Sequence, residues 1–119
     1  MVAPWVDPAL SEPCRAVGAA LMLGALTPTE VRAALAAGAD VVKVFPASSA
    51  GGPGHIKALV SVFPGVAFCP TGGVEPGNVA AYLSAGAAFV GMGGALVDEK
   101  RIAAGDRAAI EAAAKAVLP

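Results

Sequence analysis

The segment Gly24-Ala-Leu-Thr-Pro28 recurs 48 residues later as Gly72-Gly-Val-Glu-Pro76. The same offset continues along the chain, where it pairs Val31 with Val79, Leu35 with Leu83, Gly38 with Gly86 and Val42 with Val90. Each copy is typical of a strand end, a glycine turn, a helix, a glycine stop and another strand. A second βα unit fits within each period, so one unit takes about 24 residues, a plausible length for a strand, a helix and two loops. The repeat therefore predicts tandem βα units.

The first helix of the repeat has a clear start in the sequence. Thr27 is a favourable N-cap, Pro28 suits the first helical position, and Glu30 completes a capping box. Gly38 supplies the left-handed residue that commonly follows a helix. The Ala-rich C-terminal segment is also expected to be helical, capped by Asp106 and ending near Leu118.

Apolar segments alternate with the expected helices and predict parallel strands. The strands are expected at residues 3–7, 19–24, 40–46, 66–71 and 88–92. Repeated βα units of this kind imply an α/β fold with a helix-covered parallel sheet, and they favour a piece of a (β/α)8 barrel over a doubly wound sheet. Five strands in 119 residues cannot close an eight-stranded barrel, which takes ~250 residues. We therefore expect residues 1–119 to form a single partial βα-barrel domain.

Composition and charge exclude several classes of function. The chain is 56% hydrophobic, and its net charge of −1, without a block of like charges, argues against a nucleic-acid surface or a membrane-binding patch. Glycines interrupt the charge-free stretch from Ala80 to Val97, so a membrane span is not expected. The N-terminus lacks a signal-peptide pattern, which predicts a cytoplasmic location. Cys14 and Cys69 form no C-x-x-C motif and His55 is the single histidine, so we expect reduced thiols and no metal.

Lys43 is a lone ammonium within the apolar segment Asp40-Val-Val-Lys-Val-Phe-Pro46. Burying a lysine is costly unless the amine is paired or neutralised. Strand alternation places Lys43 and Phe45 on one face, so the amine is expected beside an aromatic ring. Desolvation favours the neutral, nucleophilic amine that forms a Schiff base with a carbonyl substrate. The alternatives are a lysine that reaches solvent from the strand end and a structural ion pair with Asp40.

Glycine-rich turns end the next two expected strands, as Pro70-Thr-Gly-Gly73 and Gly91-Met-Gly-Gly94. In βα-barrels the reacting groups lie at the C-terminal ends of the strands, and the last two βα loops commonly bind phosphate. Backbone N–H groups of glycine turns bind phosphate without basic side chains. The two turns together predict an anion site, although a single Gly-Gly pair is more often an ordinary turn.

Other polar residues near the strand ends are weaker candidates. Thr71 could point its hydroxyl into the site or could cap a helix. His55 is expected at a surface helix start after the Gly51-Gly-Pro-Gly54 turn, and Asp7 is typical of a turn. Four further charges are expected to be solvated: Arg32, Lys57, Lys100 and Arg101.

Taken together, these motifs resemble the 2-keto-3-deoxy-6-phosphogluconate (KDPG) aldolase family, which includes 4-hydroxy-2-oxoglutarate (KHG) and phosphogalactonate (KDPGal) relatives. The resemblance covers nearly the whole chain and is most specific in Val42-Lys-Val-Phe-Pro-Ala47 and Phe68-Cys-Pro-Thr-Gly-Gly73. It implies a (β/α)8 TIM barrel, of which this chain would cover about strands 4 to 8, with strands 1 to 3 missing. It also implies a lyase of carbohydrate metabolism and the Entner–Doudoroff pathway, commonly a homotrimer, that needs no metal or other cofactor.

The resemblance also implies residue roles. Lys43 would be the Schiff-base lysine, Phe45 would line the pyruvate pocket, and Thr71 would contact the substrate. The phosphate would be held by four glycines: Gly72, Gly73, Gly93 and Gly94. The implied reaction is reversible cleavage of KDPG, or a related 2-keto acid, to pyruvate and an aldehyde such as glyceraldehyde 3-phosphate. The expected partners are these small molecules and further copies of the chain, with no nucleic acid and no membrane.

Two features depart from the family pattern. The last turn, Gly93-Gly-Ala95, lacks the serine of many relatives, so phosphate binding would depend more on backbone amides. The family's general-base glutamate and carboxylate-binding arginine have no match here, and Glu12, Glu30 and Glu75 lie at expected helix starts and receive neither role. The alternatives are a catalytically impaired phosphate-binding barrel fragment, and another phosphate-binding barrel such as an epimerase or a thiamin-phosphate synthase relative.

Overall fold

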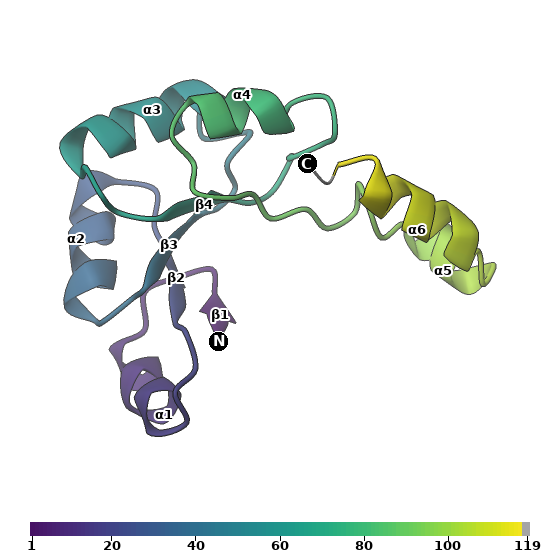
Figure 1. Cartoon of the computed structure of the whole chain (residues 1–119). Coiled ribbons are helices and arrows are strands. Elements are labelled where there is room, and N and C mark those ends of the chain that lie inside the picture. Colours follow the sequence, from purple (N-terminus) through teal and green to yellow (C-terminus); the bar gives the residue numbers. More distant parts are fainter. Residues whose placement is uncertain (118–119) are drawn as a thin grey trace.

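The computed structural model describes residues 1–117, which form a four-stranded parallel sheet with helices (Figure 1). The strands are β1 (Val2–Ala3), β2 (Met22–Gly24), β3 (Val41–Val44) and β4 (Phe68–Pro70), and they lie in the order β1-β2-β3-β4. The helices are η1 (Pro8–Leu10), α1 (Ser11–Ala16), α2 (Pro28–Ala36), α3 (Gly52–Val62), α4 (Val79–Ser84), α5 (Glu99–Ala103) and α6 (Arg107–Lys115). Strand order follows chain order without the reversal of a doubly wound sheet. The tandem βα units are therefore confirmed.

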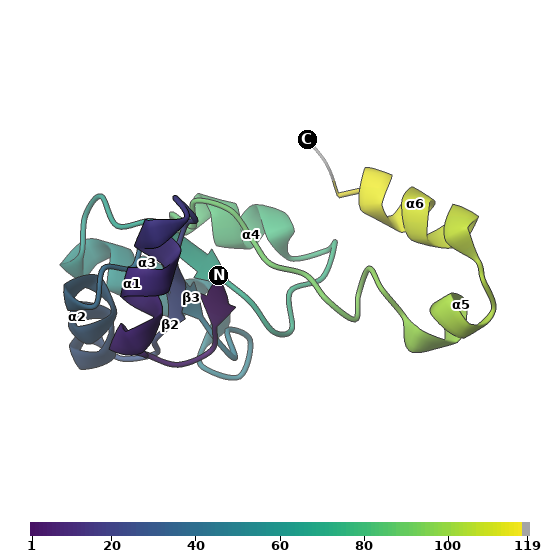
Figure 2. The same ribbon diagram turned by 90° about the horizontal axis from the view of Figure 1, so that it is seen from below.

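The sheet has one covered face and one open face (Figures 1 and 2). The covered face packs beneath α2 and α3, with α4 against α3, and carries buried side chains from every strand: Ala3, Leu23, Val42, Val44 and Phe68. The open face carries Lys43, which is in register with Gly24 on β2 and Cys69 on β4. Phe45 follows on the same face and is 40% exposed. Strand alternation thus places Lys43 and Phe45 on one face of the sheet, as predicted, and this face is turned away from the helical layer.

The strands are shorter than predicted, and the prediction of a fifth strand was wrong. The N–H groups of Ala88 and Gly91 donate to the carbonyls of Phe68 and Pro70 at 3.0 and 2.9 Å, so this segment follows β4. Its β pairing is nevertheless limited to one bridge, between Thr71 and Gly91. Among the described residues β4 is its one hydrogen-bonded neighbour, so no strand on its other side holds it in register. β1 also ends early, at Ala3, although the Trp5 carbonyl still accepts the N–H of Gly24 at 3.3 Å.

The helix signals of the first repeat are confirmed. The Oγ1 atom of Thr27 accepts the N–H of Glu30 at 3.3 Å, and the Glu30 carboxylate accepts the N–H of Thr27 at 2.8 Å. Gly38 follows the helix end with a φ of +86°. The second copy differs because α4 begins at Val79, beyond the position that matches Pro28. Its turn instead continues to Asn78, whose side chain accepts the N–H of Glu75 at 3.0 Å.

The helices α5 and α6 pack against each other and extend away from the sheet (Figures 1 and 2). Asp106 caps α6 as predicted, because its Oδ1 atom accepts the N–H of Ala109 at 3.0 Å. The expected helix end near Leu118 lies outside the described residues. Within residues 1–117, every helix is too short or too polar to cross a membrane.

Candidate active site

A cleft of about 520 Å³ lies at the C-terminal ends of β3 and β4. Its wall contains Phe45 from the loop after β3, Thr71-Gly-Gly73 from the turn after β4, and Gly93-Gly94 from the turn before α5. The parallel strands bring these loops to one edge of the sheet. The structure therefore gathers all the predicted site residues except Lys43 in the wall of one cleft.

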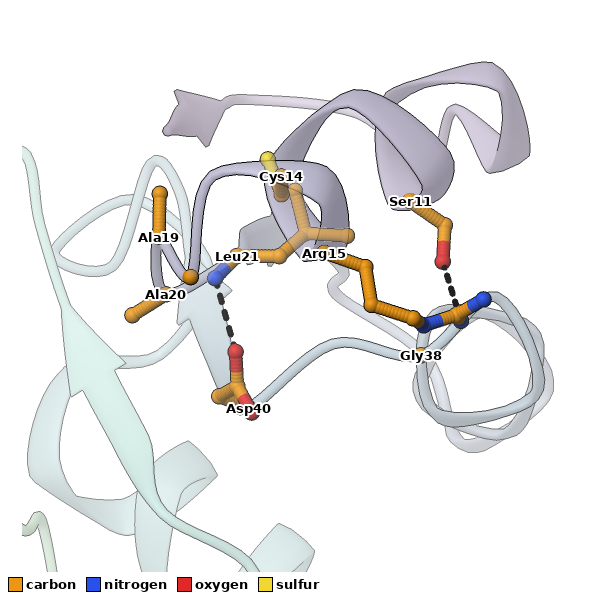
Figure 3. A pocket seen from close by; sticks show the side chains of 9 residues that line it. Ser11, Cys14, Arg15, Ala19, Ala20, Leu21, Gly38 and Asp40 are labelled. Carbon is orange, nitrogen blue, oxygen red and sulfur yellow. Dashed lines mark hydrogen bonds between the residues drawn. The ribbon is translucent and has the colours of Figure 1, made fainter.

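Lys43 is not part of the cleft wall, but it contacts Phe45, which is. Its side chain lies on the open face, and its Nζ atom is 5.0 Å from the centroid of the Phe45 ring, within the range of a cation–π contact. No ion pair forms at Lys43 within residues 1–117. Asp40 lies at the other end of β3 and accepts the N–H of Leu21 at 2.8 Å (Figure 3). The alternative of a Lys43–Asp40 ion pair was therefore wrong.

Cys69 and Thr71 lie between Lys43 and the first glycine turn. Cys69 is buried next to Lys43 in the strand register, and the Thr71 hydroxyl lies 3.8 Å from its Sγ atom. Burial raises the pKa of the Cys69 thiol, while the Thr71 hydroxyl and the positive charge of Lys43 partly offset this rise. The thiol therefore stays neutral near pH 7. Thr71 caps none of the described helices, and its hydroxyl also donates to the Cys69 carbonyl at 3.4 Å.

The first glycine turn is fixed against the loop after β3. The N–H of Ala47 donates to the Thr71 carbonyl at 2.8 Å, and the N–H of Ser48 donates to the Gly72 carbonyl at 3.1 Å. Gly72 and Gly73 have φ values of +88° and +71°, which glycine adopts without the strain of a side chain. The carbonyls of Thr71 and Gly72 are therefore hydrogen-bonded within the protein.

The N–H groups of both turns remain available. Within the described part of the chain, no protein acceptor pairs with the backbone N–H groups of residues 72–74 or 93–95. All six residues line the cleft. Successive unpaired N–H groups in a turn are the arrangement that binds anions such as phosphate.

Two contributors to the cleft were missed by the sequence reasoning. Val74 adds a third N–H to the first turn, and Glu75 adds the one charged side chain among the lining residues. Glu75 occupies the repeat position of Thr27, a helix cap, so the sequence predicted a helix start there. No local sequence signal marked them, because their place in the turn depends on α4 beginning only at Val79.

Two further carboxylates and the histidine are engaged elsewhere. Glu12 pairs with Arg15 at 3.4 Å on the exposed surface of α1. Asp7 caps η1 by accepting the N–H of Ala9 at 3.0 Å, in agreement with its predicted turn. His55 lies at the start of α3, as predicted, but it is half-buried rather than fully exposed, with its Nε2 atom 2.7 Å from the Leu26 carbonyl. The reason is that α3 begins at Gly52, which places His55 in the first helical turns facing the loop after β2.

A second cleft, of about 410 Å³, lies at the opposite ends of the strands (Figure 3). It is bordered by Asp40 and by Arg15, whose guanidinium donates to the Ser11 hydroxyl at 3.0 Å. It contains none of the predicted site residues. Within residues 1–117, no three His, Cys, Asp or Glu side chains gather into a metal site.

Comparisons of sequence identify the family. A profile described as KDPG and KHG aldolase matches residues 1–113. The chain is 33% identical over 118 residues to the 2-dehydro-3-deoxy-phosphogluconate aldolase of Treponema pallidum. The matched region covers 99% of this chain and 56% of that protein. It is 48% identical over 82 residues to the 2-dehydro-3-deoxy-6-phosphogalactonate aldolase of Escherichia coli, covering 66% of this chain and 40% of the relative. The chain thus spans about half the length of the curated relatives it matches.

Solved structures agree with this assignment. The KDPG aldolase of Legionella pneumophila, in which pyruvate was captured as a covalent carbinolamine, superposes with a TM-score of 0.87 at 32% identity, covering 99% of this chain and 57% of that one. The aldolase of Zymomonas mobilis with 3-phosphoglycerate gives a TM-score of 0.73 at 34% identity, covering 95% and 55%. These neighbours are of the TIM-barrel class, which agrees with the parallel sheet found here. On its sequence and on its fold, the chain belongs to the KDPG and KHG aldolase family.

Proposed function

We propose that this chain supplies the Schiff-base lysine and the phosphate site of a class I aldolase acting on a 2-keto-3-deoxy phosphosugar acid such as KDPG or its galactonate isomer. One observation carries the proposal. The aromatic ring that contacts the Lys43 ammonium, Phe45, shares a cleft with Thr71 and with the unpaired N–H groups of two glycine turns. The proposal extends to the Entner–Doudoroff role, cytoplasmic location and homotrimeric assembly that the family resemblance implies.

The arrangement suits a substrate with a ketone at one end and a phosphate at the other. The ketone end would lie over Phe45, within reach of Lys43, and the phosphate would accept hydrogen bonds from the N–H groups of the glycine turns. Thr71 lies between them and could donate its hydroxyl to the substrate. The 3-phosphoglycerate in the Zymomonas relative supports a phosphorylated ligand in this family.

The proposed reaction begins when the neutral amine of Lys43 attacks the C2 ketone. The resulting carbinolamine loses water to give an iminium ion. A base then takes the proton of the C4 hydroxyl, the C3–C4 bond breaks, and its electron pair moves into the iminium to form an enamine as the aldehyde departs. Protonation at C3 and hydrolysis release pyruvate and the free amine. In the cleavage direction, the pyruvate carbinolamine captured in the Legionella relative corresponds to the last of these intermediates, from which pyruvate is released.

A second candidate function is phosphate binding by a catalytically impaired barrel fragment. One observation favours it: the cleft wall has a single carboxylate, Glu75, which belongs to the proposed phosphate turn rather than to the lysine end. We assign the general base to no residue of this chain. This candidate predicts ligand binding without turnover.

Trapping with borohydride tests the proposal. Pyruvate plus borohydride is expected to leave one reduced adduct on the peptide containing Lys43, and the Lys43→Arg variant is expected to lose it, because a guanidinium stays protonated and forms no Schiff base. Lys57→Arg is the matched control, since Lys57 is an exposed lysine on α3. An adduct on Lys57, or none in the folded wild-type chain, would contradict the proposal. An adduct without cleavage of KDPG or its isomer would favour the impaired fragment.

A further inference from the structure

Asn78 connects the start of α4 to the first glycine turn through both atoms of its side-chain amide. The Oδ1 atom accepts the N–H of Glu75 at 3.0 Å, and the Nδ2 atom donates to the carbonyl of Gly73 at 3.0 Å. A backbone N–H only donates and a backbone carbonyl only accepts, so these two partners fix the orientation of the amide. Asn78 therefore holds two successive peptide groups of the turn, Gly73–Val74 and Val74–Glu75.

The second hydrogen bond sets the direction of one peptide group. The carbonyl of Gly73 and the N–H of Val74 belong to the same planar trans peptide and point in opposite directions. When Asn78 holds the carbonyl on its side, the N–H of Val74 is directed to the other side of the turn. Val74 is only 3% exposed, and its side chain belongs to the core, so it contributes its backbone to the cleft wall.

The first copy of the repeat provides an internal comparison. The residue that matches Asn78 is Glu30, whose carboxylate accepts the N–H groups of Leu26 and Thr27. A carboxylate only accepts, so the first copy has a cap for its helix but no donor for a turn carbonyl. Asparagine at the second position keeps an acceptor for the N–H of Glu75, the residue that matches Thr27, and adds the donor. The addition occurs in the copy whose turn lines the cleft.

We propose that Asn78 is a positioning residue for anion binding in this cleft. It holds the Gly73–Val74 peptide so that the N–H of Val74 joins those of Gly72 and Gly73 in binding one phosphate group. This inference rests on the proposed function, because the anion is the phosphate of the sugar-acid substrate. Asn78 itself touches neither the phosphate nor the reacting atoms.

The test is a titration of the full chain with inorganic phosphate, followed through backbone amide resonances. In the wild type, phosphate is expected to shift the amides of residues 72–74 together with those of Gly93 and Gly94. In Asn78→Ala, the dissociation constant is expected to rise roughly tenfold, as for the loss of a charge-assisted hydrogen bond. The shift at Val74 is expected to disappear while the shifts at Gly93 and Gly94 remain. A purely structural role would not produce this local pattern.

Glu30→Ala is the matched control because it removes the equivalent cap from α2, away from the cleft. It is expected to leave the phosphate dissociation constant unchanged. If Asn78→Ala does not fold, Asn78→Asp decides, since aspartate keeps the acceptor for Glu75 and loses the donor to Gly73. It is made with Glu75→Gln, so that the charge at the cleft matches that of the wild type, which is its reference, and Glu75→Gln alone measures the effect of losing that carboxylate.

Unchanged phosphate affinity in either Asn78 variant, with binding intact in the wild type, overturns the role of Asn78 and leaves the proposed function standing. A wild-type chain that shows no phosphate shifts overturns both the role of Asn78 and the phosphate half of the proposed function. The Lys43 adduct then reports separately on the Schiff-base half. A tenfold loss confined to the Asn78 variants supports the inference.

Discussion

Gly73 shows how strictly the proposed phosphate turn depends on single residues. Its φ is +71°, and a Cβ atom built on it would lie 2.3 Å from the Cβ of Ser48. Ser48 cannot easily move, because its N–H is bonded to the Gly72 carbonyl at 3.1 Å. A glycine is therefore required here by both conformation and space.

We expect Gly73→Ala to lower the free energy of unfolding by about 1–3 kcal/mol, because both the left-handed backbone and the contact with Ser48 become strained. It should also weaken phosphate binding, since any relief of the strain moves the N–H groups of the turn. Chemical denaturation and a phosphate titration measure the two effects. Gly77→Ala is the matched control, because a Cβ atom there meets nothing within 4 Å. A Gly73→Ala chain that binds phosphate as tightly as the wild type would argue against a role for this turn.

The capping box of α2 gives a pH-dependent prediction for one element. Hydrogen bonds from the backbone N–H groups of Leu26 and Thr27, and from the Thr27 hydroxyl, hold the pKa of Glu30 below its usual value, and slight burial opposes them. A carboxyl whose pKa is lower in the folded state stabilises the fold at pH values above its unfolded pKa of about 4.3. This stabilisation is lost as the pH falls through the folded pKa.

We therefore expect Glu30→Gln to lower the free energy of unfolding near pH 7. The loss should be less than about 1 kcal/mol, because the hydrogen bonds between Thr27 and Glu30 are exposed. The difference from the wild type should shrink between about pH 5 and pH 3. Urea denaturation at several pH values measures it. Glu99→Gln in α5 is the control, because the Glu99 carboxylate accepts no hydrogen bond within residues 1–117. A difference that stays constant with pH would contradict the assignment.

Local signals account for the elements that the sequence predicted correctly. The start of α2 depends on contacts between Thr27 and Glu30, and its end depends on the conformation of Gly38, all within a few residues. The fifth strand was mispredicted because strand formation depends on a partner as well as on apolar residues. Residues 88–91 donate hydrogen bonds to β4 but form only one bridge.

The candidate site, like the helices and strands, was predicted where local signals determine it. Lys43 and Phe45 followed from strand alternation, and the glycine turns followed from their place at strand ends. Val74 and Glu75 could not be found in this way, because their place in the cleft depends on where α4 begins. The contact between His55 and the Leu26 carbonyl joins residues 29 positions apart, and no local pattern encodes it.

At the scale of the whole molecule, the open sheet face and the C-terminal helices leave much apolar surface exposed. On the open side, Val2 at the sheet edge is 56% exposed, and Trp5 and Phe45 are also exposed. No residue of α5 or α6 is buried, and the two helices contact each other away from the sheet. Exposed apolar surface beside an unpaired strand edge favours association.

We expect the isolated chain to self-associate at micromolar concentrations and to have aldolase activity far below that of a relative of full length, because no residue here is assigned as the general base. Light scattering measures the first effect, and a lactate-dehydrogenase-coupled pyruvate assay measures the second. Val2→Lys should reduce association by placing a charge on the edge strand β1. Val62→Lys is the matched control, because Val62 on α3 is 57% exposed, almost the same as Val2, but lies away from the edge. A monodisperse monomer with the activity of a complete aldolase would contradict both expectations, and it would direct the search for a base to the one carboxylate in the cleft wall, Glu75.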